Sequence, residues 1–157
     1  MKKMIQLVAM SLFVFSVAAW AQQDPFVGSW KANVAKSKYN PGPPPARGNM
    51  HEIEAVPNGI RVVTRGVNAQ GEPTGSQWTA YYDGKDVPMN DLSGNFDTIA
   101  IKKTGPRSFE AVSKKGGKAV RTSQWTLSAD GTSFTRTTKG TNAQGVAFDD
   151  VLVYEKQ

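Results

Sequence analysis

The sequence has 157 residues, the length of one domain, and contains no cysteine, which excludes a disulfide framework. Lysine and arginine outnumber aspartate and glutamate by 19 to 13, and a formal charge of +6 keeps a small domain soluble without implying nucleic acid as a partner. With one histidine and no cysteine, the chain also lacks the usual ligands of a transition-metal site.

Residues 1–21 have the pattern of a secretory signal peptide. Two lysines follow the first methionine, residues 5–19 are mostly apolar, and residues 19–21 (Ala-Trp-Ala) form a small-x-small cleavage signature. A transmembrane anchor is the alternative, but the apolar run is shorter than the roughly 20 residues that span a bilayer. No cysteine is present at the cleavage point to carry a lipid. We therefore expect a periplasmic or secreted domain of residues 22–157, without a membrane span after cleavage.

This domain opens with a predicted strand over residues 27–33. Because strand residues alternate sides, one face carries Phe26, Gly28, Trp30 and Ala32. The proline-rich residues 40–45 follow, and such a run cannot continue a helix or a central strand. We interpret it as a stiff polyproline loop crossing one end of the domain, although a ligand of a proline-recognition module has the same composition.

From Met50 onward, short strand patterns alternate with glycine-rich turns, and no helical period is convincing. The further predicted strands are residues 51–56, 60–67, 77–83, a short one near 87, 96–103, 109–114, 119–128, 133–139 and 146–155. Nine or ten sequential hairpin strands favour an all-β fold, an antiparallel up-and-down β-barrel, because closure removes exposed edge strands. A Greek-key sandwich is the alternative.

One segment is nearly repeated: residues 64–71 (Thr-Arg-Gly-Val-Asn-Ala-Gln-Gly) resemble residues 138–145 (Thr-Lys-Gly-Thr-Asn-Ala-Gln-Gly). Asparagine first and glycine fourth are typical of a type I turn. Alternate turns of a meander lie at the same end, so we expect both copies on one rim. The two copies are either one type of turn used twice or the two parts of a binding rim.

Gly28-Ser29-Trp30 resembles the Gly-x-Trp opening of the calycin superfamily, which includes the lipocalins and fatty-acid-binding proteins. Residues 153–156 (Val-Tyr-Glu-Lys) resemble the last strand of the fatty-acid-binding proteins. Together with residues 36–39 (Lys-Ser-Lys-Tyr), the opening is more specifically similar to small exported bacterial lipocalin-like proteins of unassigned function. The resemblance implies a barrel with an internal apolar ligand site, a structural role for Gly28, and Trp30 closing one end with a basic side chain packed against it.

The sequence also departs from these families. The proline run leaves no room for the helical lid of the intracellular fatty-acid binders, and the C-terminal helix of lipocalins is missing. Leu152 stands where the fatty-acid binders have an arginine that holds a carboxylate. The resemblance therefore carries the fold better than the ligand.

Catalytic chemistry finds little support. His51 is the single histidine, it lies in a predicted strand, and no Gly-x-Ser-x-Gly motif accompanies it. The aspartates between residues 83 and 97 do not have EF-hand spacing and are interpreted as turn caps. The seven basic residues between 102 and 121 fall at opposite ends of a hairpin, so we interpret them as solvated turn charges. We expect no enzyme activity, no metal and no cofactor.

The predicted barrel interior carries both aromatic residues and charges. On the faces that hold the large aromatics, Arg121, Arg136 and Asp150 also point inward. A core does not accept such charges unpaired, so they either pair and fill the barrel or line a pocket; outward-facing arginines are the third possibility. The candidate ligand-binding residues are Trp78, Tyr82, Arg121, Trp125, Phe134, Arg136 and Tyr154.

We therefore expect non-catalytic binding of a small apolar or amphipathic ligand inside an exported barrel. Aromatic residues would hold its tail and arginine its acidic head. The alternative is a surface interaction or inhibitor module of the cell envelope that uses the rim with the repeated turns. The sequence does not identify the ligand or a protein partner.

Overall fold

The computed structural model describes residues 23–157, so the predicted signal peptide lies outside the described residues. Its strands are β1 (Gly28–Ala32), β2 (Met50–Val56), β3 (Gly59–Val67), β4 (Pro73–Tyr81), β5 (Val87–Asp91), β6 (Thr98–Gly105), β7 (Ser108–Lys115), β8 (Lys118–Leu127), β9 (Ser133–Thr141) and β10 (Ala147–Lys156). The described residues contain one helical element, the 3₁₀ turn η1 (Val34–Lys36), and no helix that could cross a membrane.

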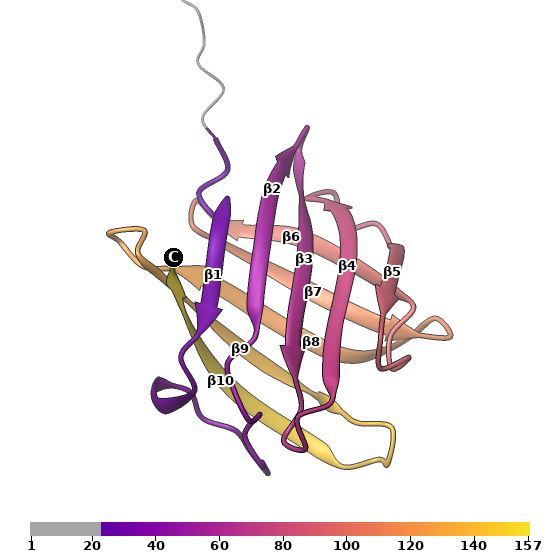
Figure 1. The fold of residues 1–157 in the computed structure, drawn as a ribbon. Helices are drawn as coiled ribbons and strands as arrows, with labels where there is room; N and C mark the ends of the chain where they lie inside the picture. Colours follow the sequence, from indigo (N-terminus) through magenta and orange to yellow (C-terminus); the bar gives the residue numbers. More distant parts are fainter. Residues whose placement is uncertain (1–22) are drawn as a thin grey trace, which may run out of the picture.

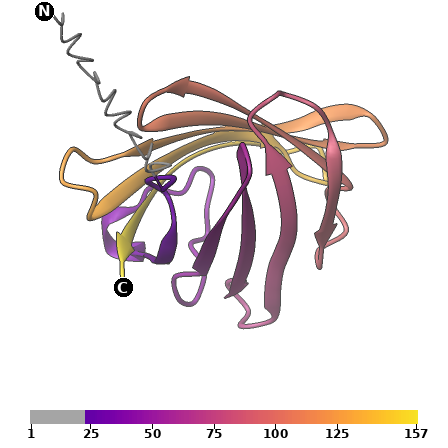
Figure 2. The same cartoon turned by 90° about the horizontal axis from the view of Figure 1, so that it is seen from above.

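All ten strands form one closed antiparallel barrel in which each strand pairs with its sequence neighbours and β1 pairs with β10. The closing register places Trp30 opposite Lys156 and Ala32 opposite Tyr154. Strands β1–β5 make one wall, and β6–β10 cross behind them (Figures 1 and 2). This confirms the predicted up-and-down barrel and excludes the Greek-key sandwich.

Below, the upper end is the end that carries the turns β2–β3, β4–β5, β6–β7 and β8–β9, and the lower end carries the others. Residues 33–49 edge the lower end, where β1 is too short to pair with the whole of β10. Lys38 takes over the pairing with Val151, and the Ala46 amide donates to the carbonyl of Asn68 in the β3–β4 turn. The structure describes all of residues 33–49, and among them only Asn49 lines the interior cavity that is described in the next subsection. The proline-rich loop therefore follows the rim, and the expectation that it crosses the barrel end is wrong.

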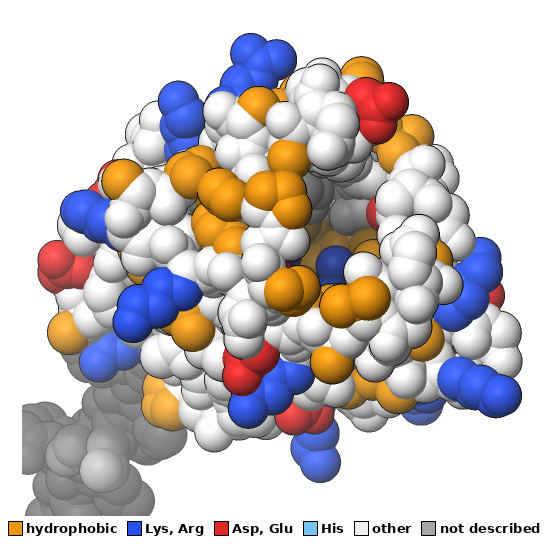
Figure 3. Space-filling view, turned by 90° about the horizontal axis from the view of Figure 1, so that it is seen from below, with side chains coloured by type: hydrophobic (Ala, Val, Ile, Leu, Met, Phe, Trp, Pro, Cys, Tyr) orange, Lys and Arg blue, Asp and Glu red, His pale blue; other side chains and the backbone are white. Residues whose placement is uncertain are grey.

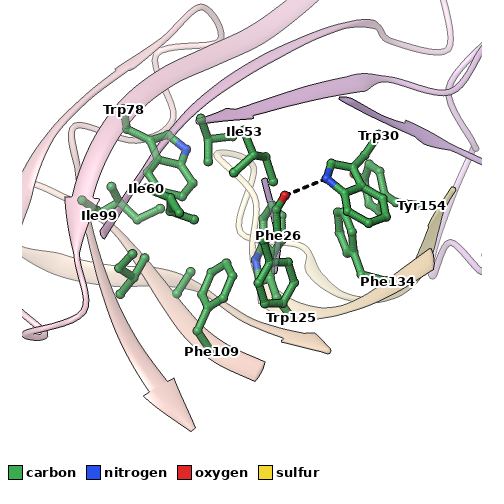
Figure 4. Packing of buried hydrophobic residues seen from close by; sticks show 14 of the residues in the cluster. Phe26, Trp30, Ile53, Ile60, Trp78, Ile99, Phe109, Trp125, Phe134 and Tyr154 are labelled. Carbon is green, nitrogen blue, oxygen red and sulfur yellow. Dashed lines mark hydrogen bonds between the residues drawn. The ribbon is translucent and has the colours of Figure 1, made fainter. Parts of the chain in front are cut away.

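An aromatic core fills the barrel toward its upper end (Figure 4). Phe26, which precedes β1, is fully buried and packs edge-on against Phe109, with ring centroids 4.8 Å apart. The indole Nε1 of Trp30 donates a 2.8 Å hydrogen bond to the carbonyl of Phe26, fixing the incoming chain inside the barrel. The rings of the buried cluster belong to Phe26, Trp30, Trp78, Phe109, Trp125, Phe134 and Tyr154.

The requirement for glycine before Trp30 has two local causes. Gly28 has φ +137°, a conformation that side chains rarely allow, and a Cβ there would lie 3.1 Å from Cε of Lys156. The ammonium of Lys156 in turn lies 5.3 Å from the Trp30 ring centroid, a cation–π contact. The Gly-x-Trp opening thus seats a tryptophan under a basic side chain from the last strand, as the resemblance implies.

We predict that Phe26→Ala destabilises the domain by about 3–5 kcal/mol, because it removes a fully buried ring from a core that cannot close over the gap. Urea unfolding of residues 22–157 measures this change. Leu92→Ala is the control, since Leu92 is 69% exposed and its removal should change stability by less than about 0.5 kcal/mol. Equal losses of stability in the two variants would contradict the role of Phe26 in filling the upper end of the barrel.

Candidate functional site

The aromatic core stops short of the lower end, where the interior becomes polar around a cavity of about 210 Å³. Seen from this end, the molecule is hollowed, and a lysine or arginine side chain is visible inside the hollow (Figure 3). Basic and aromatic side chains line the cavity from β2, β4, β8, β9 and the β5–β6 loop: His51, Trp78, Phe96, Arg121, Trp125 and Arg136.

Arg121 reaches this cavity because β8 alternates its side chains, and Ser123, Trp125 and Leu127 on the same face are buried. Its Nη2 donates to Ser113 Oγ at 3.0 Å, and its guanidinium carbon lies 3.9 Å from the Phe96 ring centroid. Burial, followed by the charge of Arg136, lowers the pKa of Arg121 to about 9. The guanidinium is therefore charged at neutral pH, and a nearby anion would stabilise its charge.

Arg136 and His51 form the second basic group of the cavity. Nη1 of Arg136 donates to His51 Nε2 at 3.4 Å, so Nδ1 carries the histidine proton and donates to Thr64 Oγ1 at 2.8 Å. Burial, then the charges of Arg136 and Arg121, hold the pKa of His51 well below its ordinary 6.5. His51 is therefore neutral, with both ring nitrogens engaged, and its ring packs at a tilt against that of Tyr154, with the centroids 4.6 Å apart.

Three residues that line the cavity each contain a buried N–H group without an acceptor: Nε of Arg121, Nε of Arg136 and Nε1 of Trp125. The hydroxyl of Tyr154, in the adjoining core, is also unpaired. All three N–H groups are donors, and buried donors normally find an acceptor, so the arrangement suits an oxygen-bearing anion.

The carboxylates near the cavity accept hydrogen bonds from groups other than the two arginines. Asp91 lies in the cavity lining, where its carboxylate accepts hydrogen bonds from Ser93 and Asn95 of the β5–β6 loop. Asp150, which could have paired with the arginines, accepts instead from the Asn40 amide at 2.9 Å. Within residues 23–157, neither Arg121 nor Arg136 forms an ion pair. Of the three sequence-based possibilities, the structure matches the lined pocket.

The seven predicted ligand-binding residues divide into three groups. The cavity brings together Trp78, Arg121, Trp125 and Arg136. Phe134 and Tyr154 belong to the aromatic core beside it, their rings stacked 4.5 Å apart. Tyr82 lies at the upper end, so the structure does not bring it to this cavity.

The position of Tyr82 is explained by a contact with the residues preceding β1. Its hydroxyl donates to Asp24 at 2.8 Å, and Lys103 Nζ pairs with the same carboxylate at 3.1 Å while lying 4.0 Å from the Tyr82 ring centroid. Burial, then the hydrogen bond to Asp24, raises the pKa of Tyr82. These residues border a wider, more open hollow of about 1210 Å³. Its lining contains none of the unpaired buried donors found among residues 23–157.

His51, Thr64, Ser113 and Ser123 line the cavity but were not predicted as ligand-binding residues. The period-2 pattern contained the signal for His51, because Ile53 two positions later is apolar and buried on the same face. Ser113 and Ser123 similarly share a face with Ala111 and Trp125. The sequence contains no distinctive signal for the two serines, because small hydroxyl residues are ordinary on a solvent-facing strand.

The two repeated turns do lie on one rim, at the lower end, and they have the same geometry. Asn68 Oδ1 accepts from the amides of Gln70 and Glu72 at 3.0 and 2.9 Å. Asn142 Oδ1 accepts from the amides two and four residues later, at the same two distances. The repeat is thus accounted for by one asparagine-capped turn used twice.

No family model matches the chain, and no curated protein is similar to it in sequence. Among solved structures, it is similar to the zebrafish ileal bile acid-binding protein complexed with cholic acid, at 15% identity and TM-score 0.55, over 85% of this chain and 99% of that one. Rv2717c from M. tuberculosis is similar at 13% identity and TM-score 0.55, over 85% of this chain and 93% of that one. A redesigned β-barrel gives 14% identity and TM-score 0.51, with 85% and 92% covered. Identities this low show the fold alone, which is a calycin-like closed barrel.

We predict that the resonances of the single histidine show no titration midpoint near pH 6.5, because the folded-state pKa lies well below that value. Unfolding then takes up a proton as the pH falls below about 6.5, so stability decreases by up to about 1.4 kcal/mol per pH unit. NMR and urea unfolding measure the two effects, and His51→Gln should remove this part of the pH dependence. A histidine titration midpoint near 6.5 would contradict the buried neutral state.

Proposed function

We propose that the barrel binds a small amphipathic acid without chemistry, with the acidic group held between Arg121 and Arg136. The observation that supports this best is that three residues lining the interior cavity each contain a buried N–H group without an acceptor. A carboxylate accepts up to about four hydrogen bonds, so an acid bound beside these residues could supply the missing acceptors after small side-chain shifts. The fold, similar to that of a bile acid-binding protein, is compatible with such a role.

The charges of the cavity favour an anion over a neutral ligand. Arg121 and Arg136 contribute two positive charges, Asp91 one negative charge, and His51 none, so the empty cavity is positive. Burying like charges together is costly, and a bound carboxylate would relieve that cost through charge-assisted hydrogen bonds. Trp78 and Trp125 provide apolar surface beside the proposed anion position.

Calorimetric titration with hexanoate tests the proposal, with hexanamide as an uncharged ligand of the same shape. We predict that hexanoate binds and hexanamide does not, and that Arg121→Gln or Arg136→Gln weakens hexanoate binding at least tenfold through loss of a charged hydrogen bond.

Lys118→Gln is the matched control, because it removes the same charge from an exposed position in the β7–β8 hairpin. It should leave hexanoate affinity within about twofold. Thermal unfolding of every variant checks that the barrel is intact. Equal weakening by all three substitutions would indicate only a general charge effect, and the proposed cavity role would then fail.

We further propose that the domain is exported, to the periplasm or beyond it. The pattern of residues 1–21 supports this, as does the resemblance of the domain opening to small exported bacterial lipocalin-like proteins. Expression of the full sequence in a bacterium, followed by fractionation and intact-mass analysis, should yield a periplasmic or secreted protein that begins at Gln22. Recovery of the uncleaved chain from the cytoplasm would argue against export.

A further inference from the structure

A second cavity, of about 250 Å³, lies beside the first at the lower end and is mostly apolar. It is enclosed by the β5–β6 loop, the tip of the β7–β8 hairpin and the β9–β10 turn, and its apolar lining is Phe96, Val120, Ala143 and Phe148. We call it the outer crevice. Phe96 also lines the interior cavity, so this one side chain belongs to the walls of both.

The position of Phe96 makes it a partition. Its ring lies against the guanidinium of Arg121, 3.9 Å from ring centroid to guanidinium carbon. Arg121 has an independent anchor in its hydrogen bond to Ser113, so the arginine does not depend on Phe96 for its position. A rotamer change of Phe96 would therefore open a route from the arginines to the crevice.

On the far wall of the crevice, Gly140 allows neighbouring groups to pack closely against the backbone. Phe148 lies over Gly140, its partner on β9, and a Cβ at Gly140 would lie 2.7 Å from Cζ of Phe148. The same Cβ would lie 2.4 Å from the carbonyl oxygen of Val120. Only glycine at this position leaves room for the Phe148 ring and the Val120 carbonyl.

We infer that the outer crevice receives the apolar tail of the ligand and that Phe96 is the residue which sets the tail length. This inference rests on the proposed function, because the head must first lie at Arg121 and Arg136. Small-molecule pockets usually span roughly 300–1,000 Å³, and neither cavity alone reaches that range. If the two cavities are joined past Phe96, their combined volume reaches this range. The ligand class we infer is therefore an unbranched carboxylate of medium length rather than a short one.

Calorimetry with a chain-length series, butyrate, hexanoate, octanoate and decanoate, tests the inference. In the unmodified domain, affinity should rise about threefold to fourfold for each methylene that enters the crevice. Phe96→Ala should increase octanoate affinity relative to butyrate, because the partition no longer has to move. Thermal unfolding shows whether this variant is intact.

Ala143→Trp provides a second route that does not alter the arginine site, since it fills the crevice from its outer turn. It should abolish the gain from butyrate to octanoate while leaving butyrate binding unchanged. Ala69→Trp is the matched control, because Ala69 holds the same place in the other asparagine-capped turn and does not line the crevice. It should behave like the unmodified domain.

The outcomes separate the two proposals. If butyrate and octanoate bind through Arg121 but Phe96→Ala and Ala143→Trp leave their affinity ratio unchanged, the crevice is not part of the site and the inference is overturned. If no acid of the series binds, the proposed function fails and the inference fails with it. A selective loss of octanoate binding in Ala143→Trp, with Ala69→Trp unaffected, supports both.

Discussion

The hydrogen bond from Trp30 to the carbonyl of Phe26 determines how the barrel interior is divided. It holds the chain inside the upper end, where the Phe26 ring packs among Phe109, Trp125 and Phe134. Because this half is filled with rings, the cavity lined by the two arginines lies in the lower half. The small size of this cavity is thus a consequence of the aromatic packing around Phe26 above it.

Much of this arrangement could be predicted because alternation along a strand is a strong constraint. Arg121 and Arg136 share faces with buried Trp125 and Phe134, so their inward direction was implied once the aromatics were placed in the core. Alternation says nothing about position along the barrel axis. Tyr82 was therefore grouped with Trp78 from the same face, although it lies at the opposite end and bonds to Asp24, far away in sequence. The path of residues 33–49 was missed for a similar reason, since it follows from how far β1 extends along β10.

The two arginines show how a barrel tolerates interior charge without a salt bridge. Each has one hydrogen bond and an aromatic face beside it: Phe96 for Arg121, and Trp125 and Tyr154, both 5.5 Å away, for Arg136. Cation–π contacts and single hydrogen bonds recover only part of the lost hydration. Two arginines buried in this way stabilise the barrel less than well-packed apolar side chains of similar volume would.

The seam between β1 and β10 also has a kinetic consequence. Trp30 and Lys156 face each other across it, so this ladder joins the two ends of the domain. Bringing such distant segments together has a larger loop-closure entropy than forming the hairpins between consecutive strands, so we expect this ladder to form late. Until the seam closes, β1 and β10 each have an unpaired edge, and the barrel is open to association with other chains during that interval.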